Sequence, residues 1–196
     1  MTSEHPYPYL YSMPTDAANT RWTYARMVAE LPPDSRYELH DGILLDMSPA
    51  PLPYHQDVLL NLALLFRLFL VEQGAGKAYV APVDVILGPS EVVQPDLFIL
   101  LGDPKRKLDG PLRGAPDLVV EILSPGSVYR DQVEKRALYA QCGVQEYWIV
   151  DPDAKSVEIN RLQDGVYLLH AFATGTGAIT SALLPDLTVG FGEVFG

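Results

Sequence analysis

Two acidic residues, Asp96 and Glu121, have the type and spacing to bind one metal ion together. If residues 94–101 and 116–123 form an antiparallel pair of strands joined by a loop, counting back from the loop places Asp96 opposite Glu121. Opposite side chains hold their Cβ atoms about 4.5–5.5 Å apart, so two like charges there repel unless a cation bridges them. Carboxylate oxygens suit Mg²⁺ or Mn²⁺, which leave further positions to water and phosphate. The pair therefore predicts phosphoryl chemistry.

The strand expected to carry Glu121 is otherwise almost entirely apolar. A strand of this composition has both faces covered, and an unpaired carboxylate inside it is costly. Glu121 therefore needs a partner. Asp96 follows Pro95, and the alternative that it only forms a Pro-Asp turn stays open.

A lysine on the next helix is the candidate cation. The helix is predicted over about residues 128–142, where Lys135, Leu138 and Cys142 share one stripe that faces inward. Lys135 lies about 10 Å along the axis from the helix start, so its side chain is long enough to approach the carboxylates. There it would orient water or neutralise charge on a phosphate. The alternative is a surface pair with Asp131, worth about 0.2–0.5 kcal/mol.

Capping residues and turn motifs predict a short helix and a hairpin in the N-terminal part of the chain. A short helix starts after Thr23, a plausible N-cap, and stops at Pro32. Residues 37–40 and 43–47 form a hairpin with a type I′ turn at Asp41-Gly42.

A long helix is predicted over residues 55–73, ending at Gly74, and it is apolar on most sides, so it packs deeply or joins a second subunit. Strands are predicted over residues 79–87 and 92–101.

The second half of the chain predicts a crossover unit. The strand at 116–123, the helix after it and a strand at 146–150 place two parallel strands in one sheet. Segments 156–162, 166–173 and 187–191 are short strands that finish the sheet and its edge. The fold class expected is α/β, a mixed β-sheet flanked by helices, with extra hairpin strands.

Length and composition favour one domain. The chain has 196 residues, of which 48% are hydrophobic, enough for one sizeable core. Residues 1–19, rich in proline and tyrosine, are expected to form a flexible N-terminal arm before a single domain at 20–196. The apolar stretch 58–71 is interrupted by Asn61 and Arg67 and is shorter than the ~18 residues of a membrane span.

Charge and cysteine content narrow the function classes. The net charge of −11 has the wrong sign for binding nucleic acid through the overall field, so any such contact is local or made by a partner. The single cysteine, Cys142, excludes an internal disulfide and fits a reducing compartment. The start of the chain lacks the pattern of a signal peptide, so a cytoplasmic protein is expected.

Several motifs together resemble a known family. Pro95-Asp96, followed by Glu121-Ile122-Leu123, is similar to the PD-(D/E)xK nuclease superfamily, and within it to a widespread bacterial family described as "putative restriction endonucleases". The resemblance covers roughly Trp22 to Phe195. The supporting matches are Tyr37-Glu38-Leu39, Asp41-Gly42, His55, Val93-Gln94-Pro95-Asp96, Pro116 to Pro125, Lys135 with Tyr139, and Gly143 to Pro152.

The resemblance implies a restriction-endonuclease-like core in which Asp96 and Glu121 bind Mg²⁺ or Mn²⁺. The superfamily's lysine stands two residues after the glutamate, where this chain has Leu123. The bacterial family shares this departure, and the resemblance implies that Lys135 supplies the cation from the next helix.

The resemblance also implies a role in the site for two more residues. It implies that Glu38 lies near the metal as an outer ligand and that His55 faces the same cleft. Alternatives remain for both: Glu38 on the solvated side of its hairpin, and His55 making a local hydrogen bond at its helix start.

The function expected is metal-dependent hydrolysis of phosphodiester bonds, with DNA as substrate and with a homodimer as the assembly. One alternative is a non-catalytic module of nuclease fold that serves as an interaction scaffold. Another is a metal hydrolase of a small phosphate ester. No membrane partner is expected.

Overall fold

The structure, a computed structural model, describes residues 21–32, 35–47, 51–103, 105 and 108–196. The arm predicted at 1–19 lies outside these residues. The chain divides into two compact units, which are described separately. Unit 1 comprises Met1–Ala50 with Ile86–Val93, and unit 2 comprises Pro51–Val85 with Gln94–Gly196.

Unit 1 begins with the predicted short helix and hairpin. The hydroxyl of Thr23 caps α1 (Tyr24–Glu30) by accepting a hydrogen bond from the backbone of the first turn. Strands β1 (Tyr37–His40) and β2 (Ile43–Asp46) pair antiparallel. Asp41 and Gly42 between them both have positive φ, 48° and 74°, as a type I′ turn requires. These predictions are confirmed.

Two further strands complete this unit, β4 (Val85–Gly88) and β5 (Glu91–Val93), in the order β2-β1-β5-β4. A small apolar core holds the unit together, formed by Met27, Leu39, Ile86 and Val92.

The continuous strands predicted over 79–87 and 92–101 are wrong. The first is divided into β3 (Gly76–Val80) and β4, and the second into β5 and β6 (Leu97–Leu101). Pro82 and Pro95 lie in the interruptions, where the missing amide hydrogen stops a strand ladder. Each half therefore pairs with different neighbours.

Unit 2 is built on a six-stranded sheet in the order β11-β10-β9-β8-β6-β3. The strands not yet named are β8 (Leu118–Ile122), β9 (Glu146–Asp151), β10 (Ser156–Gln163) and β11 (Val166–Thr174). All neighbours pair antiparallel except β8 and β9, which are parallel as the crossover predicted.

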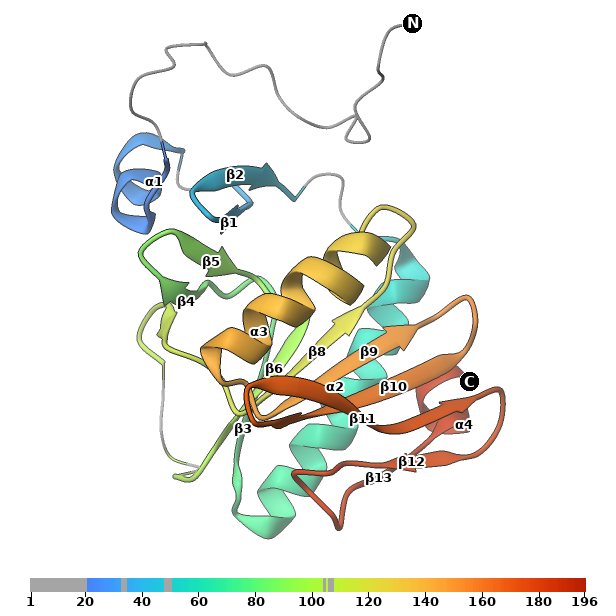
Figure 1. Cartoon of the computed structure of the whole chain (residues 1–196). Coiled ribbons are helices and arrows are strands. Elements are labelled where there is room, and N and C mark those ends of the chain that lie inside the picture. Colours follow the sequence, from blue (N-terminus) through green and yellow to red (C-terminus); the bar gives the residue numbers. More distant parts are fainter. Residues whose placement is uncertain (1–20, 33–34, 48–50, 104, 106–107) are drawn as a thin grey trace, which may run out of the picture. The chain divides into compact units, whose positions relative to one another are not determined.

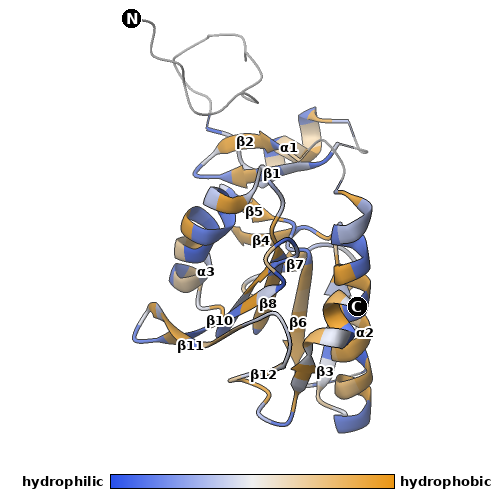
Figure 2. Ribbon diagram, turned by 90° about the vertical axis from the view of Figure 1, so that its right-hand side faces the viewer, coloured by the Kyte–Doolittle hydropathy of each residue, from blue (hydrophilic) through white to orange (hydrophobic). Residues whose placement is uncertain are grey.

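Helices cover both faces of this sheet (Figures 1 and 2). One face carries α2 (Pro53–Gln73), which starts two residues before the prediction and ends at Gly74 in the left-handed conformation. The other face carries η1 (Arg130–Lys135) and α3 (Arg136–Cys142). The predicted helix is thus present, but η1 is wound as a π-helix rather than an α-helix.

The main core lies between α2 and the sheet. Phe66 of α2 meets Trp148 of β9 edge-on, with ring centroids 5.3 Å apart. The core residues of α2 and the central strands are Val58, Leu59, Leu62, Phe66, Leu70, Leu97, Ile99, Leu118, Val120, Ile122, Trp148 and Val150. Burial of these side chains fixes the strands that carry the candidate site.

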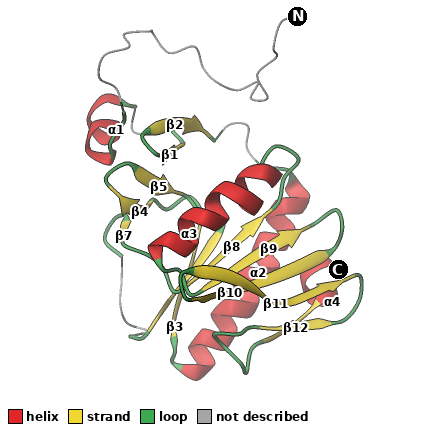
Figure 3. Ribbon diagram, viewed as in Figure 1, coloured by secondary structure: helices red, strands yellow, loops and turns green. Residues whose placement is uncertain are grey.

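The C-terminal segment departs from the prediction. The strand predicted at 187–191 does not extend the main sheet: β12 (Ala178–Thr180) and β13 (Thr188–Gly190) form a separate two-stranded sheet, and α4 (Phe191–Phe195) follows (Figure 3). A two-residue strand, β7 (Leu112–Arg113), lies between β6 and β8 in the sequence.

Helix α2 is longer than the sequence predicted. Its 21 residues make it long and apolar enough to cross a membrane by length and composition, so the expectation that this stretch is too short is corrected. This is weak evidence for a membrane, because the core helix of a soluble protein passes the same test and one face of α2 packs in the core.

Candidate active site

The predicted acidic pair comes together where β6 begins and β8 ends. The ladder pairs Leu97 with Val120 and Ile99 with Leu118. One step further along the same register, Asp96 lies opposite Glu121, as predicted. The backbone N–H of Ile122 donates to Asp96 Oδ2 (2.8 Å), and the N–H of Asp96 lies 3.4 Å from Glu121 Oε2. The Glu121 carboxylate thus lies beside the backbone of Asp96, and the Asp96 carboxylate accepts from the residue that follows Glu121.

The two acids differ in access to solvent. The side chain of Asp96 is 18% exposed, whereas Glu121 is 3% exposed. Pro95 explains the difference, because the ladder starts only after it and leaves Asp96 at the strand's open end. Asp96 is therefore the more accessible of the two acids, and Glu121 is the more deeply buried.

Lys135 points inward, as predicted. Its Nζ donates to Glu121 Oε1 at 2.9 Å and lies 3.7 Å from Asp131 Oδ1. Lys135 and Asp131 are only 2% and 3% exposed, so the alternative of a surface pair is wrong. Charges removed from water to this extent need partners, and these groups provide them for one another.

The buried stripe of the helix differs from the one the sequence predicted. Asp131, Lys135 and Tyr139, each four residues after the last, are the buried positions, whereas Leu138 and Cys142 are only half-buried. The hydroxyl of Tyr139 donates to Glu121 Oε1 at 2.7 Å. Asp131, considered only as a surface partner, and Tyr139, named only as part of the family match, are thus site residues to which the sequence assigned no role. Their spacing of four was the available signal.

The π-helical segment coincides with this cluster. Asp131 and Lys135 both belong to η1, and the chain returns to α-helix at Arg136. Short π-helical turns are rare and occur frequently at functional sites. The π-helical winding therefore occurs in the same part of the helix as the ion pairs of Lys135.

His55, near the start of α2, contacts Asp96 from the other face of the sheet. It is buried, and its Nε2 lies 3.3 Å from Asp96 Oδ2 and 3.1 Å from the Ile122 carbonyl oxygen. The alternative of a local helix-start hydrogen bond is wrong, since both partners are distant in sequence. Burial lowers the pKa of His55, but the hydrogen bond and charge of Asp96, with the Ile122 carbonyl, raise it above its ordinary value of 6.5.

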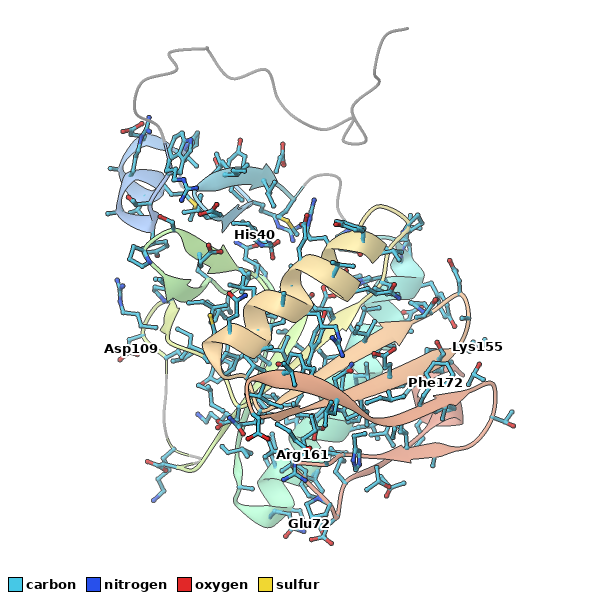
Figure 4. All side chains as sticks on the ribbon, in the orientation of Figure 1. His40, Glu72, Asp109, Lys155, Arg161 and Phe172 are labelled. Atoms are coloured by element: carbon cyan, nitrogen blue, oxygen red, sulfur yellow. The ribbon has the colours of Figure 1, made fainter. Side chains whose placement is uncertain are left out.

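Glu38 belongs to unit 1 and is described within it. Its side chain is fully buried, and Glu38 Oε2 lies 3.6 Å from Nε2 of His40, which Figure 4 labels. The alternative of a solvated face is therefore wrong for Glu38. Its role as an outer metal ligand stays a prediction.

Comparison with known proteins identifies the family. Residues 23–191 match the model of the Uma2 family, described as "Putative restriction endonuclease". The chain belongs to the Uma2 family. This confirms the restriction-endonuclease-like resemblance and supports a nuclease-like function.

A solved structure has the same fold as this Uma2 protein. It is the crystal structure of "a putative nuclease belonging to DUF820" from Anabaena variabilis ATCC 29413, with a TM-score of 0.69 and 17% sequence identity. The match covers 88% of this chain and 97% of that one, and it confirms the mixed α/β fold class. Among curated proteins, no sequence matches this chain.

The donor atoms of the Uma2 chain fit a hard divalent cation. Lys135 and Tyr139 donate hydrogen bonds to Glu121 Oε1. The other oxygen, Oε2, lies 3.4 Å from the backbone nitrogen of Asp96. Asp96 Oδ2 and the Ile122 carbonyl oxygen lie 3.3 Å and 3.1 Å from the same atom, His55 Nε2. Oxygen donors of this kind suit Mg²⁺ and Mn²⁺.

The number of side-chain ligands is small. Within the residues that the structure describes, no group of three or more His, Cys, Asp or Glu side chains forms a metal cluster. Mg²⁺ is commonly held by one or two carboxylates, with water and substrate completing its shell. Two carboxylates with a backbone carbonyl are consistent with that pattern, and less so with zinc.

Proposed function

We propose that this Uma2-family protein is a metal-dependent endonuclease that hydrolyses phosphodiester bonds of DNA. The observation that carries the proposal is the position of Glu121, which is buried between a second acid, Asp96, and an ammonium, Lys135. Two acids and a lysine around one buried point are the groups that phosphate hydrolysis with a metal requires.

Asp96, Glu121 and the Ile122 carbonyl would hold Mg²⁺ or Mn²⁺. When bound, such an ion lowers the pKa of its water and stabilises charge on a phosphate. The chain's own contribution is a fixed arrangement of donors, because the strand register and two amide hydrogen bonds hold the acids in place.

Lys135 takes the role that the superfamily gives to the residue at Leu123. The buried Leu123 carries no charge, and the ammonium reaches Glu121 from η1 instead. Held between Glu121 and Asp131, Lys135 would orient the attacking water or stabilise charge on the phosphate. Tyr139 keeps Glu121 oriented through its own hydrogen bond.

His55 acts as a positioning residue in this proposal. Its Nε2 contacts both an oxygen of Asp96 and the Ile122 carbonyl, so the imidazole limits the movement of both groups. Glu38 is proposed as an outer ligand on the resemblance alone.

Nicking of supercoiled plasmid in Mg²⁺ or Mn²⁺ tests the proposal. The wild type should nick, and Glu121→Ala should not. Glu134→Ala is the matched control, because Glu134 is an exposed glutamate on the same helical segment and should retain activity. Equal nicking by wild type and Glu121→Ala would eliminate the mechanism.

A non-catalytic scaffold is the second candidate, favoured by the net charge of −11 and by Leu123 at the usual lysine place. Calorimetric titration with Mn²⁺ separates the two. The nuclease should give binding heat that Glu121→Ala lacks, whereas a scaffold should give none beyond that control. Turnover of mononucleotides without cleavage of polymer would indicate a hydrolase of small phosphate esters instead.

A further inference from the structure

The outward face of α2 carries an apolar stripe that the fold leaves exposed. Leu60, Leu64, Leu68 and Val71 are 69%, 53%, 60% and 69% exposed, although the opposite face of the same helix packs in the core. Their spacings of four, four and three residues place them on one side of the helix. Figure 2 shows orange, apolar colour along much of α2.

Two opposite charges flank this stripe. Asp57 lies one turn before Leu60, and Arg67 lies between Leu64 and Leu68; both are exposed. Within the described part of the chain, neither has an ion-pair partner. Because the acid precedes Leu60 and the base follows Leu64 at the same spacing, the segment from Asp57 to Arg67 is self-complementary when it is turned end to end.

We propose that two copies of this chain pair through α2, antiparallel, about a two-fold axis at the level of Leu62. Leu60 then faces the partner subunit's Leu64, and Asp57 faces the partner subunit's Arg67. The axis generates each contact twice, as an isologous interface requires. This inference does not rest on the nuclease proposal.

The charges decide between two possible registers. An axis at Leu64 would also pair leucines, but it would place Asp57 against the partner subunit's Val71. Removing that carboxylate from water without a partner is unfavourable. The register centred on Leu62 pairs both charges and still buries leucine on leucine.

A second copy fits this face better than a lipid surface does. Helices that lie in a membrane interface carry mainly Lys and Arg beside their apolar face, and these residues face anionic headgroups. Here Asp57 lies one turn before the stripe, and Glu72, labelled in Figure 4, lies at the C-terminal end of α2. A lipid surface offers Asp57 no partner, whereas a second α2 offers it Arg67.

Charge reversal with sedimentation equilibrium tests the register. The wild type should be dimeric at micromolar concentration. Asp57→Arg and Arg67→Asp should each raise the dissociation constant at least about tenfold, because each creates two like-charge contacts. The double variant should return to within about threefold of wild type. Arg161→Asp, an exposed reversal on β10 with the same change of charge, should have no effect.

Three results would overturn the proposal. They are a monomeric wild type, a wild-type dimer that dissociates to bind anionic vesicles through α2, and a double variant as weak as its parents. Circular dichroism should show that all variants keep the wild-type fold, since the substituted side chains are exposed.

Disulfide cross-linking gives a second readout. In a Cys142→Ser background, a mixture of Leu60→Cys and Leu64→Cys proteins should oxidise rapidly to a mixed dimer, because the proposed register brings these positions face to face. Leu64→Cys alone should cross-link slowly. Rapid cross-linking of Leu64→Cys alone, without the mixed dimer, would overturn the proposed register.

Discussion

Two buried glutamates occupy neighbouring strands of one sheet and differ in what surrounds them. Glu121 of β8 is 3% exposed and Glu146 of β9 is fully buried. Glu146 accepts hydrogen bonds from Trp148 Nε1 (2.5 Å), Ser181 Oγ (2.7 Å) and the backbone N–H of Leu183 (2.5 Å). All three donors are neutral, and Ser181 and Leu183 connect the strand to the C-terminal segment.

Glu121 has chemically different neighbours. It accepts hydrogen bonds from Lys135 and Tyr139 and lies beside Asp96. The parallel register pairs Glu121 with Ile149, whereas Glu146 stands at the other end of its strand, opposite Leu118. Burial of a carboxylate is therefore no sign of a site by itself. The nearby second acid and ammonium distinguish Glu121 from a structural glutamate.

The largest effect expected from this comparison is on activity. Glu121→Gln should lower the plasmid-nicking rate at least about 1,000-fold, because the loss of a metal-binding charge removes several kcal/mol of transition-state stabilisation. Glu146→Gln should nick at nearly the wild-type rate under conditions where it remains folded. Similar losses in both variants would remove the distinction between the two glutamates.

Stability should report on the hydrogen bonds of Glu146. In Glu146→Gln the amide nitrogen replaces one acceptor oxygen, so a buried donor such as the Leu183 N–H loses its partner. The expected cost is about 2 kcal/mol in the free energy of unfolding, measured by urea denaturation. An unchanged urea midpoint would show that the three hydrogen bonds do not support the fold.

Tyr139→Phe probes the support of Glu121 with a smaller change. The variant removes one hydrogen bond to Oε1 and leaves the bond from Lys135 in place. A loss of about 1.5 kcal/mol is expected, or about 3–6 °C in Tm for a chain of this length. Nicking should fall less than tenfold. A loss as large as that of Glu121→Gln would instead place the tyrosine in direct contact with substrate.

His55→Gln should give the smallest effect, visible as a pH dependence without metal. The pKa of His55 is raised above 6.5 on folding, so its protonated form favours the folded state. The stabilisation is fully present below pH 6.5 and is lost as the pH rises through the raised pKa. Urea midpoints of wild type and His55→Gln should therefore converge as the pH rises. A difference that grows with pH would contradict the raised pKa.

The sequence predicted the strand register and the position of the lysine because both follow from local counting. A hairpin with a fixed loop determines which residues face each other, and Glu121 stood out in an apolar strand. The helical period turned Lys135 inward. These inferences needed no knowledge of distant contacts.

The residues that were missed depend on tertiary context. Asp131 was considered only as a surface partner of Lys135, because nothing local shows that this turn is covered or wound as a π-helix. Glu146 follows Gln145 at the start of its strand, so nothing local marks it as buried, and only the fold reveals its neutral donors. Pro82 and Pro95 were visible in the sequence, but their effect on the strands was underestimated.

The interior position of β8 has a consequence for how the protein fails on heating. β8 has β6 on one side and β9 on the other, so its amides are bonded into the middle of the sheet. Such amides exchange their hydrogens with solvent only when the whole cooperative unit opens. Glu121 on β8 therefore cannot lose its position ahead of the rest of unit 2, and the proposed nicking activity and the sheet should be lost in a single thermal transition.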